Sequence, residues 1–321
     1  MLVSWIILLL SMLIVRERDF RILLKNKLVN VRSGETHMRT DKEMLEQIMT
    51  FAKNEERVRA VTLDGSRVNP SATRDKYSDF DCVFYVRDIQ SFIKEEGWLD
   101  VFGERLLMQK PMDWFSEPYD FAGIERFAYL IQFKDGHRLD LTLCDIRKLP
   151  EETNREPRQI LLNKDNYSEL IPIETEDSFY ITVPTEKEFL DTVNEFRWLC
   201  LSISKGVCRK ELMYAKHNYD QFVVPMVIQM VNWKIGLAND FKVSTGAFGK
   251  YIGRYLSEEE MARFQGIFPS GEFKDISKKL ILMFDYFGEL EDSVAEKLDF
   301  RVDREERQKV KTFILDRFSS Q

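Results

Sequence analysis

Short apolar runs separated by polar segments dominate residues 38–153 and predict a small sheet. Five runs have the length and apolar content of strands. They are residues 58–63, 79–86, 104–108, 127–133 and 137–144. Residues 134–136 form a turn signal between the last two runs, so we expect a hairpin that lays the fifth run beside the second. Residues 41–54 and 88–96 have helical spacing and are expected to back the sheet.

The pattern changes to helical spacing from residue 185 onward. Two of these helices begin with a capping box, in which a Ser or Thr and a Glu three residues later bond each other's backbone N–H groups. The boxes are Thr185 with Glu188 and Ser257 with Glu260. A long apolar stretch covers residues 222–235, and further helices fit residues 276–287 and 304–318.

These patterns predict an α+β chain with two domains. We expect a small mixed-sheet domain over residues 38–153, a polar and irregular connection over 154–184, and an α-helical bundle domain over 185–321. A length of 321 residues, with 44% hydrophobic and 31% charged residues, is typical of a soluble protein with a sizeable core.

The first 37 residues fit neither domain. Residues 2–15 are apolar, but they are fewer than the ~20 residues that a spanning helix needs. No basic residue precedes them and no small-residue cleavage pattern follows, which argues against a signal peptide. Met38 directly precedes a capping box at Thr40 and Glu43. We therefore interpret residues 1–37 as a mis-assigned or dispensable leader, with a membrane anchor as the alternative.

The charge balance indicates which class of ligand the protein binds, and the cysteines indicate the redox state of its compartment. Residues 1–37 hold six Lys or Arg and three Asp or Glu, so the rest of the chain has 41 basic and 51 acidic residues and a net charge of −10. This balance disfavours nucleic acid, which is bound by basic surfaces, and suits a cationic small molecule. Four cysteines without a C-x-x-C pair and only three histidines predict reduced thiols in a cytoplasmic protein without a zinc site. The oligomeric state is left open.

The candidate chemistry begins with a pair of carboxylates. Asp79 and Asp81 are spaced i, i+2 at the start of a predicted strand, so both side chains point to one face. Hard cations such as Mg²⁺ are held by carboxylates together with substrate phosphates. Twelve residues before Asp79, a turn at Gly65 and Ser66 precedes Arg67. Such a turn lets backbone N–H groups approach a polyphosphate closely.

A third acid lies in a later strand. Asp140 alternates with Leu139 and Leu141, which is typical of a half-buried strand with the acid on the face opposite the leucines. Three acids behind one Gly-Ser turn favour nucleotidyl transfer. Two Mg²⁺ ions would be held by Asp79, Asp81 and Asp140, and ATP would bind at Gly65, Ser66 and Arg67. The general base is either Asp140 or another acid near the acceptor.

The order of these blocks resembles the nucleotidyltransferase superfamily of the polymerase-β type. The flanking blocks resemble the streptomycin (aminoglycoside) 6-adenylyltransferases, and the resemblance runs from Met38 to the C-terminus. These blocks are residues 98–103, 108–111, 135–143, 194–198 and 254–256.

The resemblance implies transfer of AMP from ATP to a hydroxyl of streptomycin, which inactivates the drug. It further implies a helical domain that closes the cleft, with Lys216 and Lys250 as candidate nucleotide-binding cations. The chain departs from the family pattern at Val224, where an Arg is expected, and at Ala247, where a Lys is expected. Two alternatives stay open. One is the same chemistry on another acceptor, such as a nucleic-acid end, a protein hydroxyl or another small molecule. The other is a non-catalytic nucleotide-binding relative.

Overall fold

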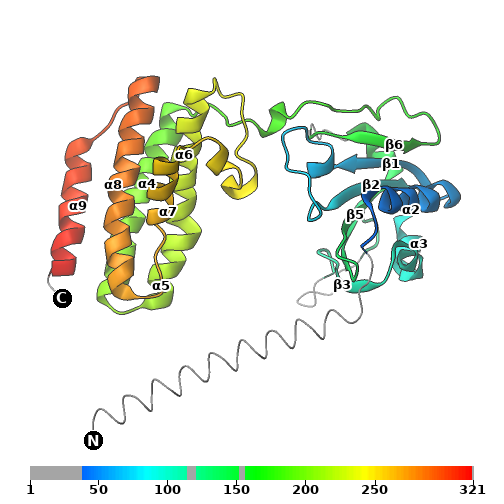
Figure 1. The fold of residues 1–321 in the computed structure, drawn as a ribbon, viewed down its shortest axis with the longest axis horizontal. Coiled ribbons are helices and arrows are strands. Elements are labelled where there is room, and N and C mark those ends of the chain that lie inside the picture. The colour runs from blue at the N-terminus through cyan, green and yellow to red at the C-terminus, as the bar shows by residue number, and fades with distance from the viewer. Residues whose placement is uncertain (1–37, 114–120, 152–155, 320–321) are drawn as a thin grey trace, which may run out of the picture. The chain divides into compact units, whose positions relative to one another are not determined.

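The computed structural model describes residues 38–113, 121–151 and 156–319 (Figure 1). The described part of the chain divides into two compact units, with the boundary between Thr175 and Glu176. Within the described ranges no helix is long and apolar enough to cross a membrane. The predicted leader at residues 1–37, including the alternative anchor at 2–15, lies outside the described residues.

The first unit is built on a mixed sheet of six strands in the order β3-β4-β5-β2-β1-β6. The strands are β1 (Val58–Asp64), β2 (Phe80–Val86), β3 (Arg105–Gln109), β4 (Arg126–Phe133), β5 (Arg138–Asp145) and β6 (Gln159–Asn163). Only β2 and β5 pair in parallel, and the other four pairs of these strands are antiparallel. The predicted hairpin therefore exists as β4 and β5, and it lays β5 beside β2 as expected.

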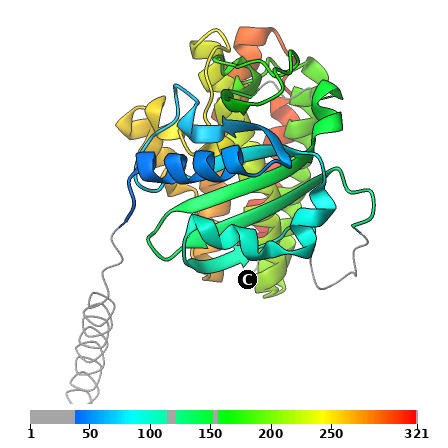
Figure 2. The ribbon, with the colours of Figure 1, turned by 90° about the vertical axis from the view of Figure 1, so that its right-hand side faces the viewer.

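The two faces of this sheet differ in how they are covered. Helices α2 (Asp41–Asn54) and α3 (Ile89–Lys94) pack on one face, and Figure 2 shows α2 lying across the strands. The leucines of β5 belong to this core, which is what their alternation with Asp140 predicts. A smaller apolar cluster, including Val83 and Tyr85, covers only part of the opposite face.

One predicted segment has more structure than expected. Residues 154–184, interpreted as an irregular connection, contain β6, which pairs with β1 at the edge of the sheet. The apolar run of β6 is only three residues long, Ile160 to Leu162, and none of these side chains is fully buried. So short a run is a weak strand signal in the sequence.

The second unit is helical. Its helices are α4 (Glu186–Cys208), α5 (Leu212–His217), α6 (Val224–Ala238), α7 (Glu258–Gly266), α8 (Phe273–Leu298) and α9 (Arg304–Ser319). The capping boxes at α4 and α7, and the one at α2, are present as predicted. A single apolar cluster joins α4, α6 and α8. The predicted α+β class, with a small mixed sheet followed by a helical bundle, is confirmed.

The four cysteines are free thiols. Cys82, Cys144 and Cys200 are buried and Cys208 is partly buried. Burial raises the pKa of the Cys82 and Cys200 thiols far above the usual range, so both stay protonated. This agrees with the predicted reduced core thiols.

Candidate active site

Strand register places three aspartates in one row across neighbouring strands. Asp64 of β1 pairs with Asp81 of β2, and Asp81 pairs with Asp140 of β5. Directly paired residues point to the same face of a sheet, and Asp79 shares that face because it lies two residues before Asp81. We call Asp64, Asp79, Asp81 and Asp140 the acid row. Sequence reasoning identified three of them and missed Asp64.

Arg138 binds two members of the acid row. Its Nε lies 2.7 Å from Oδ1 of Asp140, and its Nη2 lies 2.7 Å from Oδ2 of the same carboxylate. The Nε atom is also 3.6 Å from Oδ2 of Asp79. Sequence reasoning missed this arginine, although its i, i+2 spacing from Asp140 on one strand could have indicated it.

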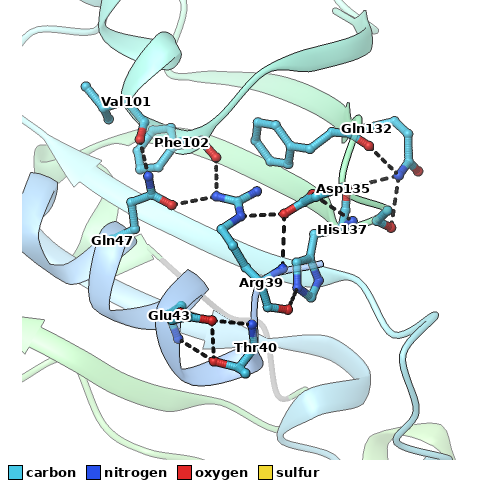
Figure 3. Close-up of polar contacts among 11 residues, drawn as sticks. Arg39, Thr40, Glu43, Gln47, Val101, Phe102, Gln132, Asp135 and His137 are labelled. Carbon is cyan, nitrogen blue, oxygen red and sulfur yellow. Dashed lines mark hydrogen bonds and ion pairs between the residues drawn. The ribbon is translucent and has the colours of Figure 1, made fainter. Parts of the chain in front are cut away.

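The start of β5 is held in place by a polar network around Arg39, shown in Figure 3. Arg39 Nε lies 2.5 Å from Oδ2 of Asp135 in the β4–β5 turn, and its carbonyl oxygen lies 2.6 Å from Nε2 of His137. Gln132 donates to the His137 carbonyl at 3.0 Å. These contacts anchor the backbone that directly precedes Arg138.

Asp81 lies at the centre of the row and carries the least favourable charge. Burial, together with the neighbouring carboxylates of Asp140, Asp79 and Asp64, raises its pKa to about 6, whereas Arg138 acts in the opposite direction. The local negative charge therefore exceeds what the nearby arginines compensate. Such a site attracts a cation.

Asp64 differs from the other acids because it has a buried partner. Nε and Nη2 of Arg158 each lie 3.3 Å from one of its carboxylate oxygens. The Arg158 side chain is 6% exposed and that of Asp64 is 11% exposed. Burial still raises the pKa of Asp64, with Arg158 acting in the opposite direction. Sequence reasoning missed Arg158 because it directly precedes β6, which the sequence pattern did not reveal.

The Gly65 turn packs directly against Asp81. Gly65 has φ +70°, and a Cβ added there would lie 2.0 Å from Oδ2 of Asp81. A side chain at this position would displace the carboxylate. Ser66, the next residue, is partly buried in the same turn. The predicted association of the Gly-Ser turn with the acids is thus present in the fold.

Arg67 has contacts that the sequence did not indicate. Its buried guanidinium donates from Nε to the Asp79 carbonyl at 2.9 Å and from Nη2 to the Ser78 carbonyl at 2.8 Å, and its contact with a phosphate stays a prediction. It also pairs with Asp41 and lies 3.5 Å from the centroid of the Phe80 ring. Arg67 therefore positions the backbone that carries Asp79.

Comparisons with known proteins show the family of the chain. The family model described as streptomycin adenylyltransferase matches residues 38–317. The chain belongs to this family. It is 34% identical over 266 residues to the aminoglycoside 6-adenylyltransferase of Campylobacter jejuni, covering 82% of this chain and 91% of that protein.

Two further similarities come from Bacillus subtilis. The aminoglycoside 6-adenylyltransferase of strain 168 is 32% identical over 266 residues, covering 82% of this chain and 93% of that protein. A crystal structure of an aminoglycoside 6-adenyltransferase from the same species has 29% identity and a TM-score of 0.44, covering 87% of this chain and 99% of that one. As a member of the streptomycin adenylyltransferase family, the protein is a nucleotidyltransferase enzyme.

The two predicted nucleotide-binding lysines of this adenylyltransferase lie in the second unit. Lys216 Nζ is 3.0 Å from Oδ2 of Asp220 and 3.4 Å from the Pro269 carbonyl. Lys250 is exposed, and its Nζ lies 5.0 Å from the centroid of the Tyr251 ring. Their contact with a nucleotide stays a prediction.

The donor set of the acid row suits Mg²⁺. Its hard carboxylate oxygens and its excess of carboxylates over arginines suit this ion. In the described ranges, however, no group of three or more His, Cys, Asp or Glu side chains lies close enough to share a metal ion. Two of the three expected ligands, Asp79 and Asp140, lie against the Arg138 guanidinium instead.

Proposed function

We propose that this protein transfers AMP from ATP to a hydroxyl of an aminoglycoside, with streptomycin as the preferred acceptor, in a Mg²⁺-dependent reaction in the cytoplasm that inactivates the drug. The observation that carries the proposal is the acid row with the Gly65 turn packed against its central member, Asp81. The family match over residues 38–317 supports the same chemistry.

The acids would serve as ligands. Two Mg²⁺ ions held by Asp79, Asp81 and Asp140 would neutralise the triphosphate and lower the pKa of the attacking hydroxyl. The oxygen of that hydroxyl forms a bond to the α-phosphorus of ATP, the bond from this phosphorus to the bridging oxygen breaks, and pyrophosphate leaves. A carboxylate of the acid row accepts the hydroxyl proton, with Asp140 as the first candidate.

The remaining residues bind and position. Backbone N–H groups of the Gly65 turn and the Ser66 hydroxyl would hold the triphosphate, because this turn lies against Asp81. Arg67 positions Asp79 by donating a hydrogen bond to its carbonyl. Lys216 and Lys250 of the helical unit are proposed as further phosphate contacts. In this mechanism the protein accelerates the reaction mainly by positioning the substrates and by electrostatic stabilisation.

The charge of the chain supports a cationic acceptor. The net charge of −10 beyond residue 37 favours a polycationic aminoglycoside over a nucleic-acid end. Both curated relatives named above are aminoglycoside 6-adenylyltransferases.

The test is pyrophosphate release by the full chain with ATP, Mg²⁺ and a panel of acceptors. We expect release with streptomycin and little release without an acceptor. Release with another aminoglycoside but not with streptomycin would change the preferred acceptor. Failure with every aminoglycoside would refute the acceptor class, and release with an oligonucleotide or a protein would move the proposal to that alternative. The absence of ATP binding would refute the nucleotidyl-transfer proposal itself.

A further inference from the structure

We propose that Arg138 competes with Mg²⁺ for the carboxylates of Asp140 and Asp79, so that metal binding requires the guanidinium to leave them. This rests on the proposed function, because it concerns the metal ligands of the same site. It assigns a regulatory role to a residue that is neither a predicted ligand nor a predicted phosphate contact.

The contacts of Arg138 carry the argument. Both oxygens of Asp140 accept a hydrogen bond from the guanidinium at 2.7 Å, so the arginine uses the lone pairs that a hard cation needs. The same guanidinium lies 3.6 Å from Oδ2 of Asp79. A divalent ion held by these two acids would therefore lie close to a positive charge and be repelled by it.

Arg138 is also placed so that it can move. Its side chain is 41% exposed and that of Asp140 is 21% exposed, so water reaches the arginine side of the pair and weakens it. The backbone before it is anchored by His137 and Asp135, so the side chain can swing away without disturbing β5. Arg158 differs, because its pair with Asp64 is almost fully buried. We therefore expect Arg138, and not Arg158, to be displaced.

The test is Mn²⁺ binding by the full chain without nucleotide, with free Mn²⁺ measured by electron paramagnetic resonance. Removing the competing charge in Arg138→Gln should lower the Kd for Mn²⁺ about tenfold. Arg138→Lys keeps the charge but loses the two parallel bonds, so its Kd should lie between those of the wild type and Arg138→Gln. Thermal unfolding of each variant checks that the fold is retained.

The chain provides a matched control at the opposite end of β5. Arg147 binds Asp145 with the same i, i+2 spacing and also through two nitrogens, so Arg147→Gln removes an equal charge from an equivalent pair. Its Kd for Mn²⁺ should equal that of the wild type. If the two glutamine variants tighten Mn²⁺ binding equally, the effect is one of net charge and the proposal is wrong.

Two other results would overturn the proposal. Arg138→Gln binding Mn²⁺ no more tightly than the wild type would show that Arg138 does not compete, and weaker binding would show that it supports the site. Asp81→Asn separates this failure from that of the proposed function. If Mn²⁺ binding depends on Asp81 but not on Arg138, only the competition is refuted. If the wild type and Asp81→Asn bind Mn²⁺ equally well, or if neither binds it, the metal site of the proposed function is refuted as well.

Discussion

The two ends of β5 carry the same ion pair in opposite surroundings. At one end Arg138 binds Asp140, and at the other end Arg147 binds Asp145, each with i, i+2 spacing and two nitrogens. The pKa of Asp145 is lowered, chiefly by hydrogen bonding to Arg147. At the opposite end the pKa of Asp81 is raised to about 6 by burial and by its acidic neighbours. One arginine compensates the charge of a single aspartate such as Asp145, but one arginine does not compensate the charge of several neighbouring aspartates.

The Asp145 end also contains a cavity of about 460 Å³, but its charges cancel. Lys148 lies 2.9 Å from Glu125, and Arg147 pairs with Asp145. The acid row has an excess of carboxylates over arginines. This difference in charge, rather than the presence of a hollow, is the reason why we propose the acid row as the reactive end of the sheet.

The largest expected effect is on activity. Asp81→Asn removes the central carboxylate and should lower the rate of AMP transfer about 10³-fold, which corresponds to about 4 kcal/mol. Asp145→Asn changes the opposite end of β5 and should keep a rate close to that of the wild type. Pyrophosphate release under saturating ATP measures both. An equal loss of rate in Asp81→Asn and Asp145→Asn would contradict the proposed difference between the two ends of β5.

The next effect concerns stability. Arg158→Met leaves the Asp64 carboxylate buried without its partner and should lower the free energy of unfolding by about 3 kcal/mol. Arg147→Met removes an arginine whose side chain is 83% exposed, and its urea midpoint should stay near that of the wild type. Urea unfolding monitored by circular dichroism compares the two. A stable Arg158→Met protein would show that this buried pair is not needed.

Two glycines with similar backbone angles allow a test of the close packing at Asp81. Gly65 has φ +70° and Gly123 has φ +76°, but an added Cβ meets Asp81 only at Gly65 and open space at Gly123. Gly65→Ala should lower the rate about 100-fold because the carboxylate is displaced. Gly123→Ala carries the same backbone strain, so it controls for stability and should retain activity. A fully active Gly65→Ala protein would contradict the geometry.

The smallest effect is the dependence of stability on pH, measured in EDTA. The raised pKa of Asp81 means that between about pH 4 and pH 6 the folded protein holds a proton that the unfolded chain has lost, so stability falls as pH rises through this window. The lowered pKa of Asp145 has the opposite sign, since its contribution is present above the unfolded value of 3.8 and is lost as pH falls through the folded pKa. Thermal scans of Asp81→Asn and Asp145→Asn against the wild type should show opposite pH trends. The same trend in both variants would refute this assignment.

Features that depend on neighbouring residues could be predicted from the sequence. The capping box at Thr40 and Glu43 begins α2 as expected, because its hydrogen bonds join residues three apart. Alternation of Asp140 with its leucines correctly put the acid on the face opposite the α2 core. The hairpin of β4 and β5 was also predicted correctly, because its turn joins two strands that are adjacent in the sequence.

Two features that depend on residues distant in the sequence were not predicted. Asp64 and Arg158 are 94 residues apart and meet only because β6 pairs with β1. Arg67 was expected at a phosphate because of its residue type, but the carbonyls of Ser78 and Asp79, brought near by folding, use its donors. The roles of Asp79, Asp81 and Asp140 as ligands stay predictions until metal binding is measured.

The most direct test of the central claim is the mass of streptomycin after incubation with the full chain, ATP and Mg²⁺. The acid-row account predicts a product heavier by one adenylyl group, formed by the wild type and by Asp145→Asn but not by Asp81→Asn. An unchanged drug in the wild-type reaction, or equal product from Asp81→Asn, would contradict it.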